Sequence, residues 1–246
     1  MGLRVTFLGA GDAFSSGGRC MAAYLVEAPE ATLLLDCGAT TLLALKKHNM
    51  DAAAIDAVVI SHLHGDHFAG LPFLFLEYVY NHPRQRPLVI AGPPGTIARV
   101  PEVFRAMYKE LAAKPMPFEL VYRELTPGVA ESIAGCTVRP FRVPHQENEV
   151  SLGLRVEAGG RTVLYSGDTG WTEALIEQSR GAQLFICECC YFETRVDFHL
   201  DYPRIAANRS RMGCDRLILT HIGREVLARL GDVNEQVAED GLAVEV

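Results

Sequence analysis

The segment SHLHGDHFAG at residues 61–70 places His62, His64, Asp66 and His67 directly after the apolar run AIDAVVI. Packing gives no reason for so many polar side chains at the end of a strand. Imidazole and carboxylate groups, without thiolate, suit Zn²⁺, Mn²⁺ or Fe²⁺ at a site that must also hold water. The segment therefore indicates a metal centre.

Three more candidate ligands follow apolar runs elsewhere in the chain. His145 follows FRVP, Asp168 follows TVLYSG, and His221 follows RLILT. Side chains at strand ends can meet at one edge of a sheet, where the strands hold them rigidly and loops leave the site open. We therefore expect one centre, built from the ends of several strands.

The elements that must position these residues alternate between short apolar runs and helix-like stretches. Strands are expected at 3–9, 21–28, 31–38, 55–60, 87–92, 137–143, 151–158, 161–167, 183–188 and 215–220, with a closing strand in GLAVEV. Helices are expected at 39–48, 68–81, 96–112, 171–179 and 202–212, with a final helix near the end. Three or four strands are expected between the helix that ends near residue 112 and the helix that begins near residue 171. With no linker or repeat, the chain is predicted to form a single domain over residues 1–246.

Composition narrows the class of function. The chain has 246 residues, with 30 acidic and 23 basic side chains and a formal charge of −7, which argues against a nucleic-acid partner. HPRQRP at 82–87 reads as a solvated loop. No apolar run approaches a membrane span, and no secretory signal is evident. Seven cysteines without framework spacing favour reduced thiols and a cytoplasmic location.

Two other patterns are assigned structural roles. Cys187, Cys189 and Cys190 lie at a buried strand end and lack a second ligand pair, so packing is preferred over metal binding. AGPPGT at 91–96 resembles a phosphate loop but lacks the Lys-Ser/Thr of a Walker motif, so a tight turn is predicted.

Taken in order, these motifs resemble those of the metallo-β-lactamase superfamily. The match consists of HLHGDH, His145, the SGD of Asp168 and the LTH ending at His221, together with LGAGDAF and LLLDCG near the start. It covers nearly the whole chain. The resemblance implies an α/β fold, a four-layer αββα sandwich with two sheets face to face and helices outside.

The same resemblance implies a site with two divalent metal ions, Zn²⁺ first and Mn²⁺ or Fe²⁺ as alternatives. His62, His64 and His145 would hold one ion, Asp66, His67 and His221 the other, and Asp168 would bridge them. A hydroxide between the ions would be available at neutral pH. Asp36 of LLLDCG would support the histidine loop, and Gly65 would allow a close backbone approach within it.

The stretch ECCYFETRVDFHLD at 188–201 resembles the tRNase Z branch of the superfamily. Glu188 and His199 match two elements of that branch, and the spacing from His199 to His221 also agrees. Two features depart from it. His199-Leu200-Asp201 replaces the branch's His-Ser-Thr, and the long arm that grips tRNA, between the third motif and the bridging aspartate, is absent from 146–167.

We therefore predict a dinuclear metal-dependent hydrolase, a phosphodiesterase for a small phosphodiester or cyclic nucleotide. The candidate catalytic residues are Asp66, His199 and Glu188, with His199 as general acid held by Glu188. A role for His199 in capping a helix near Tyr202 is the alternative. Other functions left open are an arylsulfatase or other ester hydrolase, a tRNA 3′-end endonuclease and a non-catalytic metal-binding protein. Relatives are often dimers, so a homodimer is a further expectation.

Overall fold

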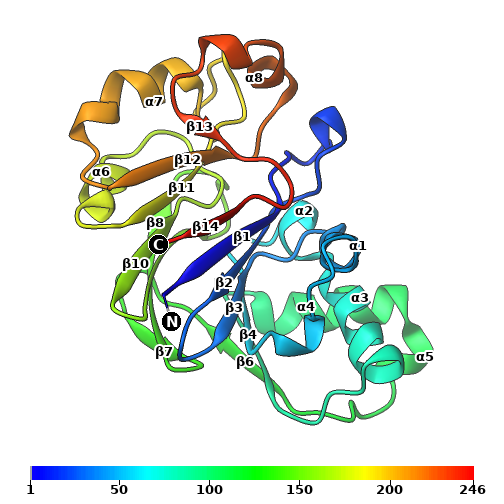
Figure 1. Ribbon diagram of the computed structural model, residues 1–246. Coiled ribbons are helices and arrows are strands. Elements are labelled where there is room, and N and C mark those ends of the chain that lie inside the picture. Colours follow the sequence, from blue (N-terminus) through cyan, green and yellow to red (C-terminus); the bar gives the residue numbers. More distant parts are fainter. Residues whose placement is uncertain (1) are drawn as a thin grey trace.

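The computed structural model describes residues 2–246, which form two seven-stranded sheets packed face to face (Figure 1). The first sheet has the order β14-β1-β2-β3-β4-β5-β6, and the second has the order β13-β12-β11-β10-β9-β8-β7. The strands of the first sheet are β1 (Arg4–Gly9), β2 (Ala23–Glu27), β3 (Thr32–Leu35), β4 (Ala57–Val59), β5 (Leu88–Gly92), β6 (Leu120–Glu124) and β14 (Ala243–Glu245). Those of the second are β7 (Glu131–Ile133), β8 (Cys136–Val143), β9 (Ser151–Ala158), β10 (Arg161–Tyr165), β11 (Leu184–Glu188), β12 (Arg216–Thr220) and β13 (Gln236–Val237).

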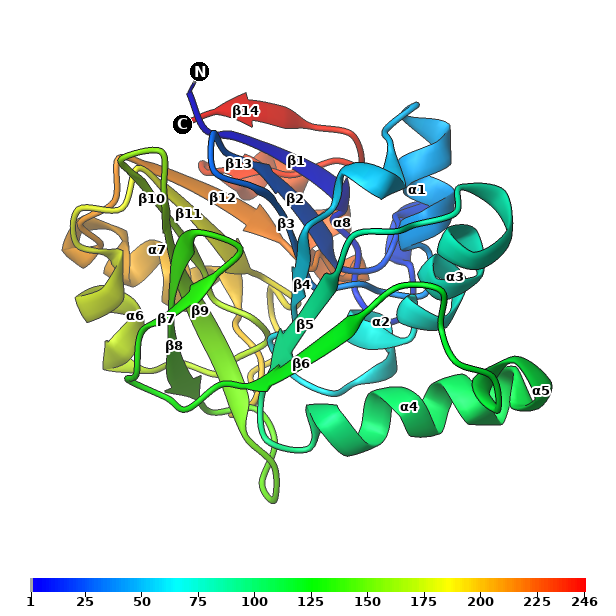
Figure 2. The same ribbon diagram turned by 90° about the horizontal axis from the view of Figure 1, so that it is seen from below.

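Helices cover the outer face of each sheet, as the two views show (Figures 1 and 2). On the first sheet lie α1 (Thr41–Lys47), α2 (Gly65–Phe68), α3 (Leu71–Leu76) with the π-helix η3 (Glu77–Asn81), α4 (Thr96–Met107) and α5 (Lys109–Ala112). On the second lie α6 (Glu173–Ser179), α7 (Tyr202–Asn208) and α8 (Arg224–Ala228). Short 3₁₀ turns occur at η1 (Ser16–Gly18), η2 (Ala52–Ala54), η4 (Arg209–Arg211) and η5 (Leu230–Asp232). The four-layer αββα sandwich is confirmed.

The central core lies between the sheets and draws on both. Val5, Phe7 and Tyr24 from the first sheet and Leu154 and Ile186 from the second are fully buried in it. Since helices cover the outer faces, inner strands such as β11 are buried on both sides, which explains why they read as continuous apolar runs. Within residues 2–246 no helix is long and apolar enough to cross a membrane.

Strand direction brings the candidate ligands to one edge. β3, β4 and β5 run parallel in the first sheet, as do β10, β11 and β12 in the second. At the edge where these strands end, backbone hydrogen bonds connect the two sheets. Leu152 N–H donates to the Ser61 carbonyl at 2.9 Å, and Ile222 N–H donates to the Ala10 carbonyl at 3.0 Å. The loops after the strands therefore share one rigid platform.

Three predicted helices are shorter or more broken than expected. The helix expected at 68–81 starts earlier, at Gly65, and is interrupted before α3, where the Gly70 N–H donates to the Cys37 carbonyl at 2.8 Å and not within the helix. The helix expected at 96–112 is divided at Tyr108, whose backbone is not helical. The helix expected at 202–212 ends as α7 at Asn208.

The strand count also differs. Five strands, β6 to β10, lie between residues 113 and 167, where three or four were expected. The two-residue β13 was not predicted. The turn expected in AGPPGT is confirmed: Gly95 has φ +99°, and the Glu124 carboxylate accepts hydrogen bonds from Gly95 N–H at 2.8 Å and Ile97 N–H at 3.2 Å. The backbone N–H groups that would bind a phosphate in a phosphate loop therefore already donate to the Glu124 side chain.

Candidate metal centre

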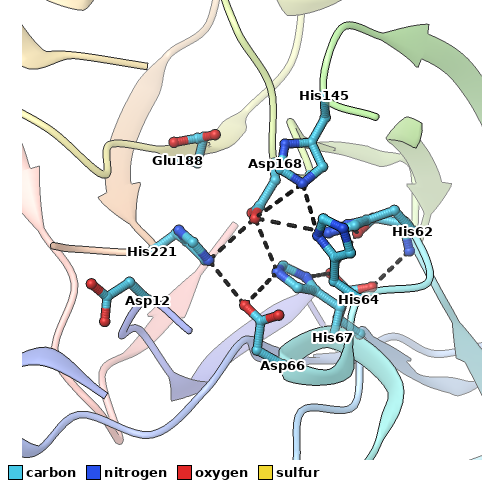
Figure 3. A network of polar contacts seen from close by, with 12 residues as sticks. Asp12, His62, His64, Asp66, His67, His145, Asp168, Glu188 and His221 are labelled. Carbon is cyan, nitrogen blue, oxygen red and sulfur yellow. Dashed lines mark hydrogen bonds and ion pairs between the residues drawn. The ribbon is translucent and has the colours of Figure 1, made fainter. Parts of the chain in front are cut away.

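The seven predicted ligands converge at the shared edge of the two sheets (Figure 3). They lie in the loop after β4, in the short helix α2, and just beyond β8, β10 and β12. The set comprises His62, His64, Asp66, His67, His145, Asp168 and His221. The structure therefore brings together every residue of the predicted set.

The ligands fall into two groups. In the first group, formed by His62, His64 and His145, one ligand atom from each residue lies within 4.8 Å of the others. The His64 Nδ1 and His145 Nε2 atoms are 3.0 Å apart.

The second group is formed by Asp66, His67 and His221. The Asp66 carboxylate lies 3.2 Å from His67 Nε2 and 3.3 Å from His221 Nε2. Two atoms bound to one tetrahedral ion at about 2.0–2.2 Å are separated by roughly 3.3–3.6 Å, so these distances suit a shared cation.

Asp168 lies between the two groups. Its Oδ2 atom is 3.3 Å from both His67 Nε2 and His221 Nε2, and 3.9 Å from both His62 Nε2 and His145 Nε2. One carboxylate therefore faces both sets of ligand nitrogens.

Several ligand atoms are buried without a hydrogen-bond partner among residues 2–246. They are His62 Nε2, His67 Nε2 and Asp168 Oδ1. A buried polar atom without a partner is costly, and such atoms usually bond to protein, water or an ion. All three atoms belong to the same cluster of histidine and aspartate side chains. Such a set of unpartnered donors fits a divalent metal ion.

Burial and neighbouring charge set the protonation of the ligands. Burial lowers the pKa of His62 well below its usual value and lowers that of His145 in the same direction, so both rings favour the neutral form that binds metal. Burial also opposes the charge on His67 and His221. Here the Asp168 carboxylate more than offsets it, and the pKa of each is raised.

Asp36 supports the cluster as expected. Its fully buried carboxylate lies 2.7 Å from His67 Nδ1 and accepts hydrogen bonds from Ser61 N–H at 2.6 Å, Ser61 Oγ at 2.7 Å and the Tyr165 hydroxyl at 2.7 Å. The Asp36 backbone has φ +58°, a left-handed conformation that costs free energy in a non-glycine residue. This network fixes the His67 ring and leaves Nε2 to face the cluster.

His199 lies beside the cluster and is oriented by Glu188. The buried Glu188 carboxylate is 2.8 Å from His199 Nδ1 and also accepts from Thr169 N–H at 2.7 Å. Burial lowers the pKa of His199, but Glu188 more than offsets this and raises it to about 9. The helix-cap alternative is wrong, because the Asp201 side chain caps α7 by accepting from Arg204 N–H at 3.0 Å.

Sequence reasoning missed three supporting groups. The Phe198 carbonyl accepts from His145 Nδ1 at 2.8 Å, the Tyr165 hydroxyl contacts Asp36, and Ser61 Oγ lies 3.1 Å from His62 Nδ1. Ser61 adjoins the histidine motif and could have been found there. A backbone carbonyl such as that of Phe198 leaves no trace in the sequence.

Of Cys187, Cys189 and Cys190, two belong to the apolar core and one lies beside the metal cluster. Cys187 and Cys189 are fully buried in the apolar layer between the second sheet and its helices, as expected. Cys190 is also buried, but it lies within 4.8 Å of ligand atoms of His199 and His221.

A cavity of about 460 Å³ opens over the cluster. Beside the ligands, its wall includes Gln146, Glu147, Glu149, Phe198 and His199. No lysine or arginine lines it within residues 2–246. Arg99, the nearby cation, is engaged in an ion pair with Glu149.

Several known proteins are similar to this chain in sequence and in fold. Ribonuclease Z from Methanosarcina acetivorans is 28% identical over 294 aligned residues, covering 98% of this chain and 93% of that protein. Ribonuclease Z from Mycobacterium tuberculosis (strain H37Rv) is 28% identical over 240 residues, covering 89% and 85%. The crystal structure of the short form of human tRNase Z has a TM-score of 0.79 and 26% identity, and covers 99% of both chains.

A further neighbour supports the fold alone. The metallo-β-lactamase fold protein YhfI from Bacillus subtilis has a TM-score of 0.79 and 23% identity, with 99% of both chains covered. The family model described as "Anti-Pycsar protein Apyc1" matches residues 3–232. The chain therefore belongs to the anti-Pycsar protein Apyc1 family, among the tRNase Z-like metal-dependent hydrolases of the metallo-β-lactamase superfamily.

Proposed function

We propose that this protein is a dinuclear metal-dependent phosphodiesterase that acts on a small phosphodiester, with a cyclic nucleotide as the leading candidate. The observation that carries the proposal is the position of Asp168, whose carboxylate lies within 3.9 Å of ring nitrogens from both ligand groups. Two-metal hydrolases place their ions about 3.5–4 Å apart and share a carboxylate-sized bridge between them.

In this proposal His62, His64 and His145 hold one ion, Asp66, His67 and His221 hold the other, and Asp168 contacts both. Zn²⁺ fits the histidine-rich donor set best, with Mn²⁺ or Fe²⁺ as alternatives. The bound ions would lower the pKa of a coordinated water molecule and neutralise the negative charge on the phosphoryl oxygens.

The chain's own residues would complete the reaction. His199 Nδ1 is engaged by Glu188, which leaves Nε2 to donate a proton to the departing oxygen. Glu188 would hold the ring and stabilise its protonated form. Asp66, whose side chain is 10% exposed, reaches the cavity and is a candidate to accept the proton of the attacking water.

Charge around the cavity favours a small substrate. The wall carries Glu147 and Glu149 but no lysine or arginine within residues 2–246. A nucleic acid presents a long row of phosphates, and binding it requires many cations outside the reacting centre. A single phosphodiester needs neutralisation only at the cluster.

A tRNA 3′-end endonuclease is the second candidate, because relatives over most of the chain are named Ribonuclease Z. Against it, the chain between His145 and Asp168 contains only a loop and the β9–β10 hairpin. The alignment with the Methanosarcina protein, at 294 residues, is longer than this chain, so that relative carries residues that this chain lacks. We therefore rank small phosphodiesters first.

The test is metal analysis of the purified protein followed by a substrate panel. The panel contains cyclic nucleotides, linear phosphodiesters, matched sulfate esters and a tRNA precursor with a 3′ extension. We expect chelator-sensitive hydrolysis of small phosphodiesters and weak, salt-sensitive tRNA binding. Preferred cleavage of sulfate esters, or specific cleavage at the tRNA 3′ end, would replace the proposal.

A further inference from the structure

Cys190 differs from the two cysteines just before it in the chain. The Cys187 and Cys189 thiols lie in the apolar core and donate to backbone carbonyls at 3.4 and 3.8 Å. Cys190 lines a second cavity, of about 500 Å³, and its buried thiol makes no hydrogen bond with the residues that the structure describes. Asp12 lines the same cavity, and Figure 3 shows it on the His221 side of the metal cluster. The Cys190 sulfur therefore lies beside the functional site and not in the core.

Two histidine rings lie close to the Cys190 sulfur. One ring nitrogen of His199 and one of His221 lie within 4.8 Å of the sulfur and of each other. His199 Nδ1 is engaged by the Glu188 carboxylate at 2.8 Å, which leaves Nε2. His221 directs Nε2 toward the two-metal cluster, and its other nitrogen, Nδ1, is buried without a hydrogen-bond partner among residues 2–246. A buried nitrogen of this kind is costly unless it bonds to protein, water or an ion.

The donor atoms of this group differ from those of the two-metal cluster. The cluster offers imidazole and carboxylate groups, whereas this group combines a thiol with two imidazoles. Thiolate ligands select thiophilic cations, and cysteine with histidine is a common ligand combination for Zn²⁺. Cd²⁺ is softer than Zn²⁺ and favours sulfur more strongly by the same rule. A cation that prefers sulfur should therefore bind this group in preference to the cluster.

We propose that Cys190, His199 and His221 form a third cation site for a thiophilic divalent ion, either Zn²⁺ in excess or Cd²⁺. The ligand atoms would be Cys190 Sγ, His199 Nε2 and His221 Nδ1. Binding replaces the thiol proton and the proton on His221 Nδ1, and both protons leave to solvent. The cation is repelled by the ion that His221 Nε2 holds in the cluster, so the third site binds more weakly and fills only when cation is in excess.

Occupancy of the third site inhibits the enzyme. His199 Nε2 is the atom proposed to protonate the departing oxygen, and a nitrogen bound to a cation has no proton to donate. Reactions whose leaving group departs without help should be spared. The binding site rests on its geometry alone, whereas the inhibition rests on the proposed phosphodiesterase function.

The first arm of the test detects the sulfur ligand directly. Cd²⁺ is added to protein already loaded with two Zn²⁺, and thiolate-to-cadmium charge transfer is followed in the ultraviolet. The wild type should gain an absorption band, and exchange of Cd²⁺ into the cluster adds no such band because the cluster contains no sulfur. Cys190→Ser should abolish the band. His199→Ala should weaken Cd²⁺ binding at this site by at least about tenfold, since it removes a ligand.

Two control variants accompany this arm. Cys20→Ser removes a different thiol, half-buried in the loop before β2, and should keep the band. Tyr80→Ala changes a side chain that is 68% exposed in another surface depression, and it should match the wild type. A band that persists in Cys190→Ser, or vanishes in Cys20→Ser, would overturn the third site. If Cys190→Ser does not fold, the Cd²⁺ affinity of His199→Ala decides, and an unchanged affinity would overturn the site equally.

The second arm measures inhibition, with each variant normalised to its own rate before the cation is added. Excess Zn²⁺ or Cd²⁺ should inhibit hydrolysis of an alkyl phosphodiester, and Cys190→Ser should need about tenfold more cation for the same inhibition. Hydrolysis of a nitrophenyl ester should be inhibited far less, because it does not depend on His199. Equal inhibition of both esters, or unchanged inhibition in Cys190→Ser, would contradict the proposed role. If the wild type hydrolyses neither ester, the proposed function fails, and the absorption band alone decides the third site.

Discussion

The Tyr165 hydroxyl donates a 2.7 Å hydrogen bond to the Asp36 carboxylate, although Tyr165 belongs to the second sheet and Asp36 follows β3 of the first. Both residues are buried. A second contact of this kind joins the hydroxyls of Tyr24 and Thr220 at 2.9 Å. The supports of the metal ligands are thus built across the sandwich interface, so the geometry of the site depends on the packing of the two sheets.

Asp36→Asn should lower metal affinity about 10- to 100-fold, because ligand histidines depend on the carboxylate that orients them. The neutral amide still fits the space but holds His67 Nδ1–H more weakly. Metal titration with a competing chelator measures the effect. Tyr165→Phe, which removes one of the donors to Asp36, is the comparison and should cost less affinity. Unchanged affinity in Asp36→Asn would contradict the supporting role.

His199→Ala should keep its metals and its fold but lose about 10²- to 10⁴-fold in kcat on alkyl phosphodiesters, which need a protonated leaving group. The loss should be far smaller on a nitrophenyl ester, whose leaving group departs without help. A His199 nitrogen lies within 4.8 Å of ligand atoms of His145 and Asp168, so distance alone does not separate a proton donor from a ligand. Equal losses on both esters, or loss of metal, would assign His199 to the metal shell.

Metal binding should release protons at pH 7. Although burial opposes it, Asp168 raises the pKa of His67 well above its usual value and raises that of His221, so the protonated form of both rings is favoured in the metal-free protein. Each ring must lose its proton to bind a cation, and affinity should therefore rise with pH. Calorimetry in buffers of different ionisation enthalpy counts the protons. A binding enthalpy that is independent of the buffer would show that the rings were already neutral.

Glu225→Gln should destabilise the metal-free protein at pH 7 by about 1 kcal/mol and by less near pH 2. Burial alone would raise the pKa of Glu225, but the Thr194 hydroxyl and three backbone N–H groups stabilise the carboxylate and lower it to about 2. An unfolded glutamate titrates near pH 4.3, so this stability is present above about pH 4 and is lost as the pH falls toward 2. Urea unfolding of both proteins at the two pH values is the measurement. A difference that persists unchanged at pH 2 would refute the account.

Much of the site followed from the sequence because its ligands stand at strand ends in a dense motif. The position of Asp168 after TVLYSG and that of His221 after RLILT were sufficient to place them at one edge. Their exact backbone conformations were not. His221 has φ +52° and Asp36 has φ +58°, and nothing in either residue type requires a left-handed conformation. The surrounding packing imposes it.

Some features of the fold likewise have a signal in the sequence, and others have none. The break before α3 had a signal, since Gly70 is followed two residues later by Pro72 at the start of the new helix. The break at Tyr108 had none, because the surrounding residues favour helix and tertiary packing overrides them. A two-residue strand such as β13 is too short to produce a hydrophobic pattern.

The central claim is a two-metal centre joined by Asp168, and elemental analysis of Asp168→Ala beside the wild type tests it most directly. The wild type should contain two divalent ions per chain after dialysis against metal-containing, then metal-free buffer. The variant should lose occupancy at both sites, because it lacks a ligand to each ion and the negative charge that offsets their mutual repulsion. Tyr80→Ala should match the wild type. Two fully retained ions in Asp168→Ala, or a single ion in the wild type, would contradict the account.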